Sequence, residues 1–165
     1  MPTKLSEVPA HLPASPFRAV QGGVVFAHDQ SAGPQPRDAA AERILVVEDD
    51  FLVATQMEAA LADAGFEIAG VAASADEAIA LAASERPALC VMDVRLAGVR
   101  DGVEAAIEIS ETLGIRCIFA TAHADPGVRM RAQKAVPLGW LQKPFSMASL
   151  IDLVRTALRD LDGKN

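Results

Sequence analysis

Aromatic residues are scarce in this 165-residue chain: they make up 4% of it, and tyrosine is absent. A surface that stacks the bases of single-stranded nucleic acid needs several aromatics, so that class of binding protein is disfavoured. Basic residues are outnumbered, 15 Lys and Arg against 22 Asp and Glu, and the net charge of −7 repels a phosphate backbone. We therefore expect no nucleic acid among the direct partners.

Long apolar runs are missing as well. No window approaches the ~20 consecutive apolar residues that cross a bilayer, and residues 1–20 contain four prolines and no apolar run of signal-peptide length. Cysteine is limited to Cys90 and Cys117, both inside apolar segments, which is typical of buried, reduced thiols rather than a disulfide framework. These absences predict a cytoplasmic protein with no membrane partner.

The composition of the chain changes near residue 42. Six of the ten prolines lie before this point, together with several glycines. Proline lacks an amide donor and biases the preceding residue toward extended geometry, so regular structure cannot continue for long there. We expect residues 1–42 to be a flexible Pro/Gly-rich N-terminal tail and residues 43–162 to form a single folded domain.

From residue 43 onward, short apolar runs alternate with segments of helical periodicity. The predicted strands are residues 43–47, 66–72, 88–92, 115–120 and 138–142. Ser74 and Glu77 have capping-box spacing, and Asp125 before Pro126 is typical of a helix start. Because continuous apolar strands alternating with amphipathic helices are typical of a parallel sheet covered on both faces, the predicted fold class is a doubly wound five-stranded α/β sandwich, (βα)5.

The residues that follow these strands are chemically distinctive. They are Glu48, Asp49, Asp50, Asp93, Thr121 and Lys143. In an open parallel sheet, ligands bind beyond the carboxyl ends of the strands, so we expect these side chains to converge on one edge. Crowded carboxylates without His or Cys favour Mg²⁺, and a lysine beside them indicates phosphoryl transfer, with Asp93 attacking phosphorus and Thr121 binding a phosphoryl oxygen.

Each of these residues also has an ordinary interpretation. Asp50 is equally well explained as the N-cap of the first helix, and Trp140 as either a core residue or a rotating surface aromatic. Glu48 and Asp93 alone would be charges at the ends of buried strands, and Lys143 a solvated loop lysine. Their joint occurrence at equivalent strand ends is what favours a functional site.

The chain resembles the receiver domain of two-component response regulators across about residues 43–161. The matching segments are ILVVEDD (44–50), VMDVRLAG (91–98), DG (101–102), FATA (119–122) and WLQKPF (140–145). The resemblance implies the strand order 2-1-3-4-5. It further implies that Asp93 is the phospho-acceptor and that Lys143 contacts the phosphate.

The same resemblance assigns the remaining site residues. Asp49 is implied as the direct Mg²⁺ ligand, Glu48 as an acidic neighbour that helps hold the ion through water, and the backbone carbonyl of Arg95 as a further ligand. Thr121 and Trp140 correspond to the pair of residues that rearranges after phosphorylation. Of these, Trp140 departs from the family, since its indole cannot make the hydrogen bonds of a phenol.

We therefore expect a stand-alone, single-domain response regulator. It would take its phosphoryl group from a sensor histidine kinase or a histidine phosphotransfer protein, and signal to a downstream protein by direct contact; homodimerisation stays open. Catalysis would be limited to its own phosphotransfer and dephosphorylation. Two alternatives are a small aspartate-nucleophile phosphatase, disfavoured because Arg95 stands where that class needs a second acid, and a degenerate receiver that acts only as a binding scaffold.

Overall fold

The computed structural model describes residues 42–123 and 125–163, in which five strands alternate with five helices. The elements are β1 Arg43–Val47, α1 Phe51–Asp63, β2 Glu67–Ala72, α2 Ala75–Glu85, β3 Leu89–Asp93, α3 Gly102–Leu113, β4 Arg116–Thr121, α4 Pro126–Ala132, a 3₁₀ turn Gln133–Ala135, β5 Gly139–Gln142 and α5 Met147–Asp162. The flexible tail expected for residues 1–42 lies, apart from Glu42, outside the described residues. No helix in the described part of the chain has the length and apolar character needed to cross a membrane.

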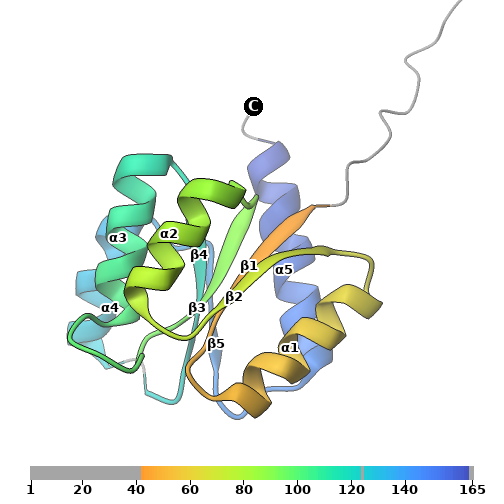
Figure 1. The fold of residues 1–165 in the computed structure, drawn as a ribbon, viewed down its shortest axis with the longest axis horizontal. Helices are drawn as coiled ribbons and strands as arrows, with labels where there is room; N and C mark the ends of the chain where they lie inside the picture. The colour runs from red at the N-terminus through yellow and green to blue at the C-terminus, as the bar shows by residue number, and fades with distance from the viewer. Residues whose placement is uncertain (1–41, 124, 164–165) are drawn as a thin grey trace, which may run out of the picture. The chain divides into compact units, whose positions relative to one another are not determined.

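The strands form one sheet in the order β2-β1-β3-β4-β5, and each neighbouring pair is parallel. This confirms the predicted fold class and strand order. The strands match the predicted runs to within one residue at their ends. In Figure 1 the chain runs from β1 to its neighbour β2 at one edge and then returns through α2 to β3 on the other side of β1, so that β3 is the central strand.

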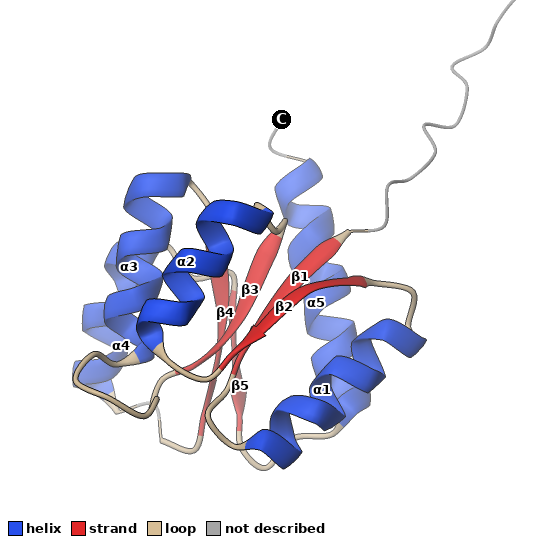
Figure 2. Cartoon of the chain, viewed as in Figure 1, coloured by secondary structure: helices blue, strands red, loops and turns tan. Residues whose placement is uncertain are grey.

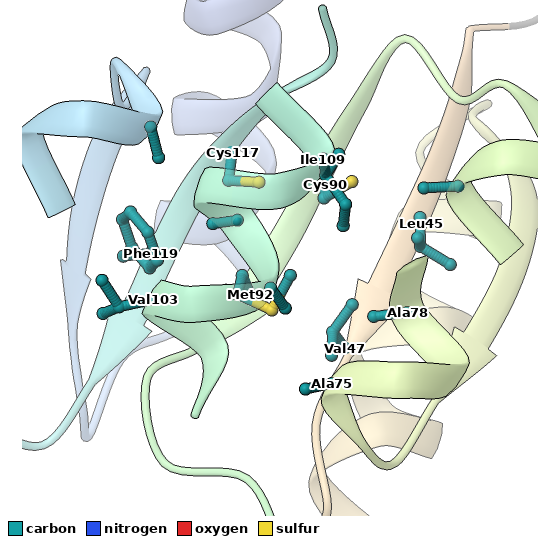
Figure 3. Close-up of a cluster of buried hydrophobic side chains, with 14 of the residues drawn as sticks. Leu45, Val47, Ala75, Ala78, Cys90, Met92, Val103, Ile109, Cys117 and Phe119 are labelled. Carbon is teal, nitrogen blue, oxygen red and sulfur yellow. The ribbon is translucent and has the colours of Figure 1, made fainter. Parts of the chain in front are cut away.

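Helices cover both faces of the sheet. Figure 2 shows α2, α3 and α4 on one side, and α1 and α5 on the other. Successive strand residues point to opposite faces. Accordingly Leu45 and Val47 pack with α2 and α3, in the cluster of Figure 3, whereas Ile44 and Val46 pack with α1 and α5. Burial on both faces explains why these strands are continuously apolar.

Side chains satisfy the amide groups at the start of each helix. The N-caps are Asp50, Ser74, Asp101, Asp125 and Ser146. The capping box expected at Ser74 forms in altered geometry, because the Glu77 carboxylate accepts the amide of Ala73 rather than that of Ser74. Asp101 and Glu104 form a complete capping box at the start of α3, which was not predicted from the sequence.

Candidate functional site

The predicted site residues lie at the carboxyl ends of β1, β3, β4 and β5, which meet at one edge of the sheet. Asp93 is the last residue of β3 and is paired with Ala120, the neighbour of Thr121 in β4. The amide of Lys143 donates to the carbonyl of Thr121 at 2.9 Å, which fixes the start of the loop after β5. Glu48 follows β1, and its amide donates to the carbonyl of Ala72 at 2.9 Å.

Lys143 contacts two acids from different strands. Its Nζ lies 2.5 Å from Oε2 of Glu48 and 2.5 Å from Oδ2 of Asp93. Glu48 and Asp93 are only 3% and 7% exposed. Burying a carboxylate is costly unless it is paired, so the ammonium compensates both charges. Residues 95 and 50 positions apart in sequence thus form one cluster, as the strand-end pattern predicts.

The surroundings of Glu48 and Lys143 shift the pKa values of both side chains. Burial raises the pKa of Glu48, and the charge of Asp93 adds to this increase, which outweighs the opposing hydrogen bond from Lys143. For Lys143, burial acts to lower the pKa, but the hydrogen bonds and charges of Asp93 and Glu48 outweigh it and raise the pKa overall. The lysine is therefore a firmly held cation between the two acids.

The donor set of the site fits a hard divalent cation. Carboxylate oxygens of Glu48, Asp49 and Asp93 lie within 4.8 Å of one another, and Asp49 is exposed to solvent. Three carboxylates and one ammonium leave a charge of about −2, and Mg²⁺ prefers oxygen ligands while retaining several waters. Glu48, Asp49 and Asp93 are thus the residues that would hold Mg²⁺.

Asp50 has a structural role. The sequence left open whether it belongs to the site or caps the first helix. Its Oδ1 accepts the amides of Leu52 and Val53 at 2.9 and 3.1 Å, at the start of α1. This is the geometry of an N-cap. Among the described residues, the group of acids able to share a metal ion includes Asp49 but not Asp50.

Thr121 lies at the same edge, but its hydroxyl is engaged within its own turn. Oγ1 donates to the carbonyl of His123 at 3.1 Å and accepts the amide of His123 at 3.2 Å. The residue is 3% exposed. The hydroxyl thus contacts neither Asp93 nor Lys143 in the hydrogen bonds of this structure, and binding a phosphoryl oxygen would require it to exchange its acceptor.

Trp140 is half-buried in β5 and stacks against its neighbours. Its ring lies 4.9 Å from that of Phe119, with 26° between the planes, and the guanidinium of Arg129 lies 4.7 Å from the indole centroid. The side chain therefore packs between Phe119 and Arg129 of α4, as in the core interpretation weighed from the sequence. Its rotation as a switch residue stays a prediction.

Arg95 follows the acceptor candidate by two positions, and its side chain is exposed. Its amide donates to Oδ1 of Asp93 at 3.0 Å. With Lys143 on Oδ2, both oxygens of Asp93 are hydrogen-bonded. The metal-binding role implied for the carbonyl of Arg95 stays a prediction.

Sequence reasoning missed how tightly α3 packs against the end of β3. A Cβ on Gly102 would lie 1.8 Å from the carbonyl oxygen of Asp93, so only glycine permits this approach. The amide of Gly102 also donates to the carbonyl of Val94 at 3.0 Å. The DG pair in the sequence was the available signal, but its spacing alone does not indicate a close contact.

The chain is similar to known proteins over most of its length. Residues 44–155 match the model of the response regulator receiver domain family. The transcriptional regulatory protein PdtaR of Mycobacterium tuberculosis is 34% identical over 120 residues, which cover 73% of this chain and 58% of PdtaR. The chemotaxis protein CheY of Halobacterium salinarum is 31% identical over 119 residues, 72% of this chain and 98% of CheY.

The fold is also similar to that of a solved receiver domain. The signal receiver domain of a modulated diguanylate cyclase from Desulfovibrio desulfuricans superposes with a TM-score of 0.71 and 29% identity, covering 76% of this chain and 99% of that one. The chain spans little more than half the length of PdtaR. The likeness therefore concerns one domain of that protein.

Proposed function

This chain belongs to the response regulator receiver domain family, and we propose that it is a phosphorylation-dependent signalling switch whose acceptor is Asp93. The observation that carries the proposal is the contact of Lys143 with both Glu48 and Asp93, at the sheet edge that also bears Asp49. A carboxylate beside a fixed ammonium and a set of hard oxygen donors has the components of a phosphoryl-transfer site.

In the proposed reaction, a carboxylate oxygen of Asp93 attacks the phosphorus of a phosphohistidine. The P–N bond of the donor breaks as the new P–O bond forms, and the released imidazole takes up a proton. Lys143, already 2.5 Å from Oδ2, neutralises negative charge on the transferring group. Bound Mg²⁺ would supply further charge neutralisation at this site. The product is an acyl phosphate on Asp93.

Thr121 and Trp140 are the proposed responding residues. The Thr121 hydroxyl donates to the carbonyl of His123 before phosphorylation, so donation to a phosphoryl oxygen would open this turn. The turn leads into α4, against which Trp140 packs through Arg129. A change at Asp93 would thereby alter the surface formed by α4, β5 and α5, where a downstream protein would bind.

A cavity of about 400 Å³ beside Lys143 supports the approach of a phosphodonor protein. Besides the lysine, it is lined by Val53, Gln56, Ala122, Pro144, Phe145 and Met147. The neighbouring first turn of α1 exposes Phe51 and Leu52. An apolar surface next to the reacting carboxylate is suited to a histidine kinase or histidine phosphotransfer protein, and the family relationship supports both partners and the expected cytoplasmic location.

The proposal extends to the organisation of the chain. Residues 43–162 would be the receiver domain, and residues 1–42 would lie outside it. Because CheY is matched along 98% of its length, the relationship supports signalling by a receiver through protein contacts alone. The relatives are mostly signalling proteins, which supports catalysis restricted to self-phosphotransfer and dephosphorylation.

Incubation with Mg²⁺ and acetyl phosphate tests the proposal. We expect intact-mass measurement to detect one added phosphoryl group in the wild type and none in Asp93→Asn. Asp50→Asn is the matched control, because asparagine keeps the N-cap and Asp50 lies outside the acid cluster. An unmodified wild type would favour the binding scaffold, and repeated turnover of small phosphomonoesters would favour the phosphatase.

A further inference from the structure

The carboxylate of Asp101 links two helices. Its Oδ1 accepts the amide of Glu104 at 2.9 Å and so caps α3, whereas its Oδ2 forms an ion pair with the guanidinium of Arg131 in α4. Each oxygen therefore has its own partner. The pair is partly exposed, with side chains 33% and 51% accessible. The sequence analysis gave neither residue a role.

On the α3 side, this ion pair is attached to the acceptor residue. Gly102 directly follows Asp101, and its backbone approaches the carbonyl of Asp93 so closely that no Cβ fits between them. The Gly102 amide is hydrogen-bonded to the carbonyl of Val94. Asp101 is thus held in position relative to Asp93 through the backbone.

On the α4 side, the helix also contacts the domain through Val128, which packs on the core, and through Arg129, which lies over Trp140. Among its seven residues only Ala132 is buried. Its first turn is capped by Asp125, which follows the turn closed by Thr121 and His123. Because only one residue of α4 is buried, polar contacts such as the Asp101–Arg131 ion pair contribute to what fixes its position.

We propose that the Asp101–Arg131 ion pair holds α4 in its unphosphorylated position and thereby opposes the switch. This rests on the proposed phosphorylation of Asp93. Donation of the Thr121 hydroxyl to a phosphoryl oxygen opens the turn that precedes α4 and so favours movement of this helix. The ion pair between Asp101 and Arg131 opposes that movement. A restraint present in only one of two states shifts the equilibrium toward that state, and its removal favours the other.

Other charges also face Arg131. Glu104 on α3 and Asp125 at the start of α4 attract the guanidinium more weakly than Asp101 does. Replacing Arg131 removes all of these attractions, whereas replacing Asp101 removes only one. Comparison of the two replacements therefore separates the specific ion pair from general electrostatics.

The experiment measures the affinity for beryllofluoride in Mg²⁺, with the adduct detected by ¹⁹F NMR and α4 followed by amide hydrogen exchange. We expect Arg131→Met and Asp101→Asn each to bind beryllofluoride more tightly, by up to about fivefold, the range of an exposed ion pair. Asp101→Asn keeps the acceptor that caps α3. Both variants should exchange the amides of α4 faster without ligand.

The double variant and a control decide the outcome. If the two residues act as a pair, the double variant binds no more tightly than Arg131→Met alone, since Asp101→Asn has no partner left to lose once Arg131 is replaced. Arg155→Met on α5 removes the same charge elsewhere, and its affinity should equal that of the wild type. Unchanged or weaker binding in Arg131→Met, or additive effects in the double variant, would overturn the ion-pair proposal. Failure of the wild type to form any adduct would instead contradict the phosphorylation of Asp93 on which it rests.

Discussion

At the scale of single residues, the charge of the site depends on Lys143. Its ammonium neutralises one of the two acids that it contacts, and the exposed Asp49 adds a further negative charge nearby. The site therefore carries a net charge of about −2. A divalent cation neutralises this charge, whereas removal of the lysine would leave Glu48 and Asp93 buried beside each other without compensation.

Glu48 makes the stability of the metal-free protein dependent on pH. Because the pKa of Glu48 is raised above 4.5 in the folded state, its ionised form is less favourable there than in the unfolded chain. This unfavourable contribution is fully present above the raised pKa and disappears as the pH falls through that pKa to below 4.5. Glu48→Gln lacks it, so the variant should be more stable than the wild type at pH 7, by an amount that shrinks toward pH 4.5.

Urea unfolding in EDTA between pH 4 and pH 8 measures this difference. Glu58→Gln, on the exposed surface of α1, is the control and should follow the wild type throughout. A Glu48→Gln advantage that grows on acidification would contradict the sign of the shift.

At the scale of elements, the contact between α3 and β3 is the tightest constraint on the acceptor. Gly102→Ala would place a methyl group 1.8 Å from the carbonyl oxygen of Asp93, so α3 must move away. We expect a loss of about 1–3 kcal/mol in the free energy of unfolding, together with slower phosphorylation by acetyl phosphate. Denaturant unfolding and intact mass measure the two effects.

Gly163→Ala provides the comparison for this substitution. Gly163 has an ordinary φ of −72°, and a Cβ there would meet only the carbonyl of Arg159, at 3.4 Å. This variant should lose little stability and should be phosphorylated at the wild-type rate. Equal behaviour of the two alanine variants would contradict a special role for the α3–β3 contact.

The same elements explain what could be predicted from the sequence. The strands were predictable because each is a continuous apolar run, and the helices because apolar residues between these runs recur at helical spacing. The sheet edge was predictable because the ends of parallel strands meet at one edge. The contact of Asp101 with Arg131 joins residues 30 positions apart in different helices, and no spacing rule indicates it. Likewise, only the capping geometry separates Asp50 from Asp49.

At the scale of the whole molecule, binding at one edge of the sheet stabilises the entire fold. Mg²⁺ that binds the folded state alone should raise the free energy of unfolding by about 1–3 kcal/mol near saturation. Asp49→Asn should lose most of this increase, yet unfold like the wild type in EDTA, because Asp49 is exposed. Paired urea titrations with and without Mg²⁺ measure both quantities.

Asp50→Asn again serves as the neighbouring control and should retain the full response to Mg²⁺, since its cap oxygen is preserved. An equal loss in both variants would indicate a general effect of surface charge rather than a site at Asp49.

Cys90 and Cys117 stand opposite each other in the two strands β3 and β4, and neither is exposed. The contact with Cys117, together with burial, raises the pKa of the Cys90 thiol well above its usual range, so the folded protein presents almost no reactive thiolate there. A thiol-modifying reagent can reach these sulfurs only in molecules whose core between the sheet and α3 has opened. The labelling rate in native buffer therefore reports how often this core opens, and the wild-type cysteines allow the opening to be timed without a denaturant or an introduced probe.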